Sequence, residues 1–149
     1  MKKIIFTILT IIWMSIIFLL SNQKAVASTK VSNSFIDRTI INIYETFKGD
    51  VGEDEKLSIK EKFSLPVRKL AHFTVYFILG ILILCTLNEY RVDSKSIVYY
   101  AILLCFIYAC TDEIHQLFVL GRSGEFKDVV LDTVGSIIGI LLLKGKVVK

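Results

Sequence analysis

Ionisable side chains are concentrated in residues 111–135, between two strongly apolar stretches of the chain. A histidine among carboxylates can act in general acid–base catalysis, and the same side chains can hold a divalent cation. Their spacing matches neither the HExxH zinc motif nor a CxxC pair, so proton transfer and cation binding both stay open. The side chains suited to a cation are His72, Glu113, His115, Asp128 and Asp132.

Helical periodicity places the polar groups on three separate helix faces, because residues three, four or seven apart share a face. Gly135 and Gly139 continue one of these faces as a small-xxx-small pair, which would let a neighbouring backbone approach closely. We expect the three faces to line one pocket. They consist of Lys69, His72 and Tyr76; of Asp112, Glu113 and Gln116; and of Asp128 and Asp132.

Each polar side chain has a candidate role in this pocket. Lys69 and Arg122 can bind a phosphate or carboxylate group. The alternative is a purely structural cluster of ion pairs, in which Asp128 only caps the last helix. The candidate catalytic residues, which would handle a proton or a cation, are His72, Glu113, Asp128 and Asp132; the candidate ligand-binding residues are Lys69, Tyr76, Asp112, Gln116 and Arg122.

The elements that must position these groups are apolar helices. Hydrophobic residues make up 54% of the 149 residues and the mean hydropathy is +0.62, which exceeds the usual composition of a soluble domain. A helix needs about 20 residues to cross the bilayer. The sequence therefore predicts an all-α integral membrane helical bundle, one domain over residues 1–149, with four transmembrane helices near 4–20, 67–87, 97–111 and 128–143.

The outer loop, residues 21–65, contains one predicted helix. Apolar residues recur at helical spacing within residues 34–48, so this helix would lie on the outer membrane interface or pack on the bundle. The charge-rich residues 49–62 suggest a flexible linker. Pro66 is predicted in the first turn of the second span, where its missing N–H carries no penalty.

Basic residues predict the orientation in the cell membrane. They flank the first and last apolar segments and occupy the connection at residues 88–96, so the positive-inside rule places both termini in the cytoplasm. The three polar faces then meet near the outer surface. The net charge of +4 belongs to these helix ends, and we expect no nucleic-acid partner. Alternatively, the first apolar segment is a signal peptide cleaved after Ala25-Val26-Ala27; its length favours retention.

Two segments resemble the VanZ-like family of small bacterial membrane proteins: RKLAHFTVYFILG (residues 68–80) and DEIHQLFVLGRSGEFKDVVLDTVGSIIG (residues 112–139). The family is named for a member that lowers susceptibility to the glycopeptide teicoplanin, so the resemblance implies a link to this form of antibiotic resistance. Many relatives carry Asn at the position of Asp132, and the additional acid in this chain favours cation binding. The matching polar positions are Lys69, His72, Tyr76, Glu113, Gln116, Arg122 and Asp128.

We therefore expect a multi-pass membrane protein whose outward pocket engages a component of the cell envelope. The expected partners are the lipid bilayer and a cell-wall precursor, an envelope lipid or a glycopeptide. A divalent cation is the one cofactor that the side chains suggest. Two alternatives stay open: a hydrolase of envelope lipids or lipid-linked precursors that uses the same acids with His72, and a non-catalytic partner protein that docks through residues 34–48.

Overall fold

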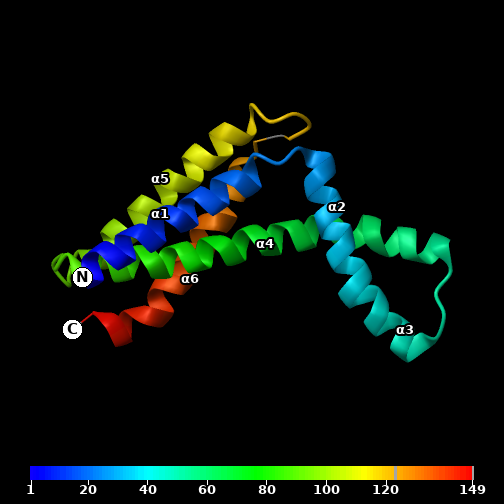
Figure 1. Cartoon of the computed structure of the whole chain (residues 1–149), viewed down its shortest axis with the longest axis horizontal. Helices are drawn as coiled ribbons and strands as arrows, with labels where there is room; N and C mark the ends of the chain where they lie inside the picture. Colours follow the sequence, from blue (N-terminus) through cyan, green and yellow to red (C-terminus); the bar gives the residue numbers. More distant parts are fainter. Residues whose placement is uncertain (123, 149) are drawn as a thin grey trace.

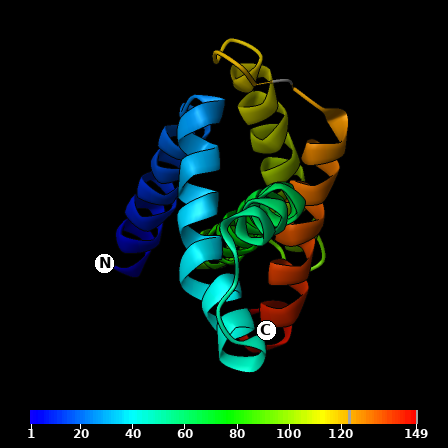
Figure 2. The same ribbon diagram turned by 90° about the vertical axis from the view of Figure 1, so that its right-hand side faces the viewer.

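The computed structural model describes residues 1–122 and 124–148, and all regular structure in these ranges is helical. The carboxyl-terminal part of the longest helix, α4, forms a bundle with three other helices, while α2, α3 and the first turns of α4 project from it (Figures 1 and 2). The elements are α1 (Lys2–Ser21), α2 (Ala25–Ile36), the π-helical stretch η1 (Asp37–Ile41), α3 (Asn42–Lys48), α4 (Glu53–Glu89), α5 (Ile97–Gln116) and α6 (Phe126–Val147).

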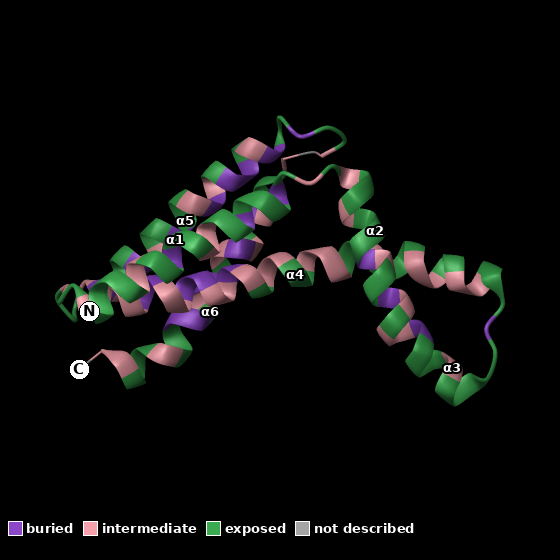
Figure 3. Cartoon of the chain, in the orientation of Figure 1, coloured by how far each residue is buried: buried purple, intermediate pink, exposed green. Residues whose placement is uncertain are grey.

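Three of the described helices, α1, α4 and α5, are long and apolar enough to cross a membrane. Large hydrophobic side chains cover the outer surfaces of α1 and α5, which are largely exposed in Figure 3. Such a surface is expected where side chains face lipid rather than water. The all-α prediction is confirmed, and these helices indicate a membrane protein. The 22-residue helix α6 carries charges near both ends and is not among the three.

The outer segment is more ordered than the sequence analysis predicted. The predicted linker at residues 49–62 is wrong, because α4 begins at Glu53. Three acids in its first turn suit the positive end of the helix dipole. The charges also pair across the helices: Lys48 lies 2.8 Å from Glu55, and Lys60 lies 2.8 Å from Asp37. These charges therefore join α4 to α3 and η1 rather than solvating a flexible chain.

Pro66 lies inside α4 rather than in the first turn of a new helix, so that prediction is also wrong. A proline in a helix interior removes one backbone hydrogen bond and costs about 3 kcal/mol or more. The helix continues because both of its halves are held by other contacts. The first half is paired with η1 and α3, and the second half packs on α6.

The most extensive helix contact in the described chain is between α4 and α6, whose backbones approach closely. A Cβ atom added at Gly135 would lie 2.6 Å from the carbonyl oxygen of Phe73, and one at Gly139 would overlap the carbonyl of Phe77. The Ser136 hydroxyl donates to the carbonyl of Tyr76 at 3.1 Å. The small-xxx-small prediction is thus confirmed. The two helices run parallel, and residues about 60 positions apart lie opposite each other.

Hydrogen bonds from side chains hold α1 against the bundle. The Trp13 indole donates to the carbonyl of Val75 on α4 at 2.8 Å, and the Tyr108 hydroxyl of α5 donates to the carbonyl of Met14 at 2.6 Å. These bonds hold the middle of α1 against α4 and α5, and at its end the buried Ser21 donates to Asp112 of α5 at 2.8 Å.

Substituting Gly139→Ala should lower the free energy of unfolding by about 1–3 kcal/mol, because the added methyl group has no room against α4. Gly145→Ala, in the same helix, is the matched control, since a Cβ there meets no atom within 4 Å. Its stability should stay equal or rise by up to about 1 kcal/mol from helix propensity. Thermal unfolding of both variants in detergent checks this, and equal stability of the two would contradict the close packing.

Candidate functional site

The polar faces of α4, α5 and α6 meet at one end of the bundle, where His72, Asp112 and Asp132 form a cluster. One ligand atom from each residue lies within 4.8 Å of the others. Asp112 is 3% exposed and Asp132 is 1% exposed, so both carboxyl groups are removed from solvent. Nδ1 of His72 is 3.7 Å from Oδ2 of Asp132. Asp132 lies four residues after Asp128 in α6, and His72 lies three residues after Lys69 in α4. Each pair therefore shares one face of its helix, and the two faces are turned toward each other.

The Asp112 carboxyl group is held on one side only. Its Oδ2 atom accepts hydrogen bonds from Ser21 at 2.8 Å and from Gln116 at 3.3 Å. Within the described ranges, Oδ1 of Asp112, Oδ1 of Asp132 and the hydroxyl of Tyr76 have no hydrogen-bond partner. A buried polar atom without a partner costs about 1–3 kcal/mol. The cluster is therefore rich in unused acceptors.

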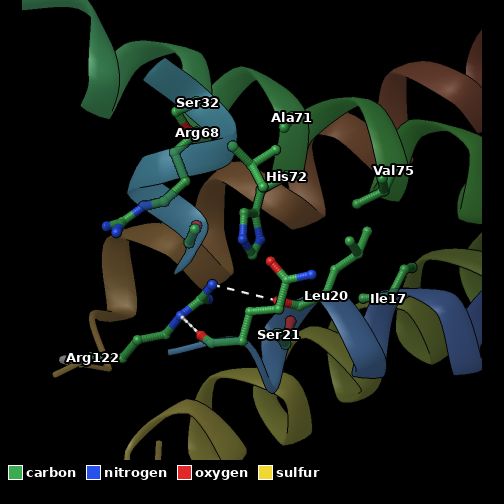
Figure 4. Close-up of a pocket in the computed structure, with 12 residues that line it drawn as sticks. Ile17, Leu20, Ser21, Ser32, Arg68, Ala71, His72, Val75 and Arg122 are labelled. Atoms are coloured by element: carbon green, nitrogen blue, oxygen red, sulfur yellow. Dashed lines mark hydrogen bonds between the residues drawn. The ribbon is translucent and has the colours of Figure 1, made fainter. Parts of the chain in front are cut away.

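Arg122 joins the connection between α5 and α6 to the end of α1. Its guanidinium group donates to the Gln116 side chain at 2.9 Å, to the carbonyl of Gln23 at 3.0 Å and to that of Leu20 at 3.4 Å. Figure 4 shows the two backbone contacts. Burial, and then the nearby charge of Arg68, lower the pKa of Arg122 from its ordinary value of 12.5. The group stays charged at neutral pH.

Four of the predicted residues make structural contacts outside the cluster. Nζ of Lys69 donates to Asp128 at 2.6 Å, so the charge of this lysine is already compensated. The Glu113 carboxylate accepts the backbone N–H of Glu125 at 2.6 Å, at the start of α6. His115 stacks on Phe18, with ring centroids 4.4 Å apart, and is not part of the cluster.

Two cavities adjoin the cluster, and Arg68, His72 and Arg122 line both of them. The larger has a volume of about 100 Å³, and the smaller about 50 Å³. In Figure 4, Arg68 and His72 lie on one side of the larger cavity, and Arg122 lies on the other side with the end of α1. Arg68 makes no ion pair with any described residue. It was not among the predicted site residues, although its position four residues before His72 puts both on one helix face.

The arrangement offers three kinds of chemistry. Arg68 and Arg122 line both cavities and form no ion pair with a described residue, which suits binding of an anion. His72 and Asp132 are close enough to exchange a proton through a small movement or one water molecule. The buried carboxylates of Asp112 and Asp132, together with His72, are suitable ligands for a cation.

Replacing Glu113 by Ala should lower the free energy of unfolding by about 1–3 kcal/mol, since the N–H of Glu125 loses its acceptor. Glu113→Gln keeps an acceptor oxygen and should retain most of the stability. Chemical denaturation of the two variants in detergent compares them. If the Gln variant were as unstable as the Ala variant, the charge of Glu113 rather than this hydrogen bond would be what the fold requires.

Comparison with known proteins gives one assignment. No curated protein and no solved structure matches the chain. A family model described as VanZ/LLP1 matches residues 6–148, nearly the whole chain, and confirms the resemblance seen in the two polar motifs. The match includes most of α1, all of α4, α5 and α6, and every residue of the cluster. The chain therefore belongs to the VanZ/LLP1 family.

Proposed function

We propose that this VanZ-family membrane protein binds an anionic lipid of the cell envelope at the outer end of its bundle. Through this lipid it would influence susceptibility to glycopeptides such as teicoplanin. The observation that carries the proposal is a small basic cavity that continues into an apolar groove. This shape suits an amphiphile with a charged headgroup.

The proposal places four helices across the membrane, with α6 as the fourth. At 1.5 Å per residue, the 22 residues of α6 span about 33 Å, which is enough to cross the hydrocarbon core. Its charged residues lie near the ends or, in the case of Asp132, face the protein interior. Both termini and the turn between α4 and α5 lie at the same end of the bundle (Figure 1), as an even number of crossings requires.

The positive-inside rule then assigns that end to the cytoplasm. The connection between α5 and α6, the start of the membrane part of α4 and the basic cavity fall on the outer side. The helices α2 and α3 would lie along the outer interface. Phe47 is 87% exposed and Val26 is 82% exposed, which suits contact with the headgroup boundary.

The dimensions of the cavity and the groove favour a lipid over a whole glycopeptide. A cavity of about 100 Å³ is smaller than the ~150 Å³ that holds benzene, so it accommodates only a small headgroup. The groove between α2 and α4 is larger, about 380 Å³, and mostly apolar. The two share four lining residues, so a headgroup and an acyl chain could occupy them together. These residues are Val31, Ser32, Ala71 and Val75.

The charges favour a phosphate headgroup. Arg68 and Arg122 carry like charges that repel across the cavity, and Arg68 contributes to the lowered pKa of Arg122. An anion bound between them would relieve this repulsion, and guanidinium groups match the oxygen geometry of phosphate. The sequence analysis assigned anion binding to Lys69 and Arg122. The pairing of Lys69 with Asp128 shifts that role to Arg68.

A hydrolase of such lipids is the second candidate. The pair of His72 and Asp132 supports it, because an imidazole oriented by a carboxylate is a common general base and His72 lines the cavity. Phosphate release from a bound polyprenyl phosphate or diphosphate, measured with purified protein and with His72→Gln, separates hydrolysis from binding alone. The partner-protein alternative instead requires that charged substitutions on α3 abolish function while lipid binding persists.

Arg68→Gln should weaken the binding of an anionic lipid about ten- to a hundredfold, since one charge-assisted hydrogen bond is worth about 1.5–3 kcal/mol. Lys62→Gln, an exposed lysine on the same helix, is the control and should bind normally. Native mass spectrometry would compare phosphatidylglycerol, a polyprenyl phosphate and neutral phosphatidylcholine. Comparing the binding of phosphatidylglycerol with that of the polyprenyl phosphate shows whether the cavity prefers a bulk phospholipid or a lipid-linked precursor. Equal retention of the neutral lipid would contradict the proposal.

The same two variants should differ in cells. A strain that lacks the protein should recover its teicoplanin response with wild type and Lys62→Gln, but not with Arg68→Gln. An immunoblot of membranes must show equal amounts of each variant. Full complementation by Arg68→Gln would show that the teicoplanin response does not require the basic cavity.

The proposed orientation predicts the labelling of single cysteines in intact cells. In a background with Cys85, Cys105 and Cys110 replaced by Ala, a membrane-impermeant maleimide should label Gly52→Cys directly. It should label Gly145→Cys only after permeabilisation. Both glycines lie in open surroundings, so the substitutions should not disturb the packing. Direct labelling at position 145 would overturn the cytoplasmic location of the carboxyl terminus.

A further inference from the structure

The cluster of His72, Asp112 and Asp132 contains more acceptor capacity than the described residues use. Asp132 is 1% exposed, yet its Oδ1 atom has no hydrogen-bond partner, and the same is true of Oδ1 of Asp112. The fully buried Tyr76 hydroxyl, beside both carboxyl groups, is also unpartnered. Leaving charged oxygens buried without partners is unfavourable. The two carboxyl oxygens, which can only accept when ionised, call for a ligand that is positively charged.

We infer that His72, Asp112 and Asp132 bind one divalent transition-metal ion, with Zn²⁺ as the preferred ion. Each residue comes from a different helix of the bundle, so the ion would join α4, α5 and α6 at one point. This inference goes beyond lipid binding and rests on the two buried carboxyl groups rather than on Arg68 and Arg122, although His72 also lines the basic cavity.

The geometry suits such an ion. Zinc binds nitrogen and oxygen ligands at about 2.0–2.2 Å, so two ligand atoms on one ion lie roughly 3–4 Å apart. The separation of 3.7 Å between Nδ1 of His72 and Oδ2 of Asp132 is in this range, and is longer than a direct hydrogen bond. All three ligand atoms lie within 4.8 Å of one another, so small side-chain movements complete the site.

The charge balance points to a cation of charge two. No lysine or arginine in the described ranges forms an ion pair with Asp112 or Asp132. Arg122 donates to Gln116 and to two carbonyl groups instead. A divalent ion would neutralise both carboxylates and leave His72 as a neutral ligand.

The donor set selects among metal ions. Calcium takes six to eight oxygen ligands and magnesium keeps an octahedral shell of oxygens, whereas one imidazole with two carboxylates suits zinc or manganese. The surrounding bonds support the site, since Ser21 and Gln116 both donate to Asp112 and orient its carboxyl group. Ser21 and His72 also line the larger cavity, so an ion held here would have open coordination positions toward it.

The experiment uses the full chain, purified in detergent through a tag without histidines. Competition with a chromophoric chelator, together with elemental analysis, measures the number of Zn²⁺ ions bound and their affinity. We expect one ion per chain. Affinity should fall at least about tenfold in His72→Gln, Asp112→Asn and Asp132→Asn. The controls are His115→Gln, a histidine outside the cluster, and Asp93→Asn, an acid in the turn between α4 and α5; both should bind normally.

Thermal unfolding of the wild type keeps the inference falsifiable if a variant fails to fold. Added Zn²⁺ should raise the unfolding temperature, and EDTA should reverse the rise. Absence of stoichiometric binding in the wild type, or unchanged affinity in the folded cluster variants, would overturn the site. Arg68→Gln separates the two proposals: it should keep the metal and lose the lipid, so that failure of one leaves the other standing.

Discussion

The rest of the structure depends on how closely α4 and α6 approach each other. Glycines at positions 135 and 139 let the backbone of α6 touch that of α4 near Phe73 and Phe77. Because the two helices run parallel, the same register that sets these contacts also sets the polar ones one and two turns earlier. It brings Asp132 to His72 and Asp128 to Lys69. The packing of small residues in the apolar part of the bundle thereby determines the chemistry at its polar end.

The polar groups divide into two kinds once their partners are known. Lys69 with Asp128, Glu113 with the backbone of Glu125, and Arg122 with Gln116 are satisfied pairs that hold helix ends and connections. Asp112, Asp132 and Tyr76 retain buried atoms without partners. A fold can use pairs of the first kind for stability, whereas groups of the second kind weaken it unless something binds them. The unsatisfied atoms, rather than the number of charges, are therefore the basis of the metal site that we infer.

Much of this arrangement could be predicted from the sequence, because hydropathy and helical periodicity are local properties. The apolar segments predicted the bundle helices, and the three- and four-residue spacings predicted the helix face that carries Lys69, His72 and Tyr76. The pairing of side chains between helices is not local. The spacing of Lys69 cannot reveal that Asp128 compensates its charge, and Glu113 looks like a catalytic acid until its backbone partner is known. The prediction of a linker at residues 49–62 was wrong for the same reason, since Glu55 and Lys60 form ion pairs with residues of α3 and η1.

The continuity of α4 has a further consequence for how the chain can vary. Its 37 residues span about 55 Å, so the first turns of α4, which pair with α3 and η1, lie on the same helix axis as His72. One residue inserted between Lys60 and Pro66 would turn the first turns of α4 by about 100° relative to the cluster, and would carry Glu55 and Lys60 away from their partners on α3 and η1. Three or four residues together nearly restore the angle. Changes in the length of this segment are therefore tolerated best when they amount to whole helical turns.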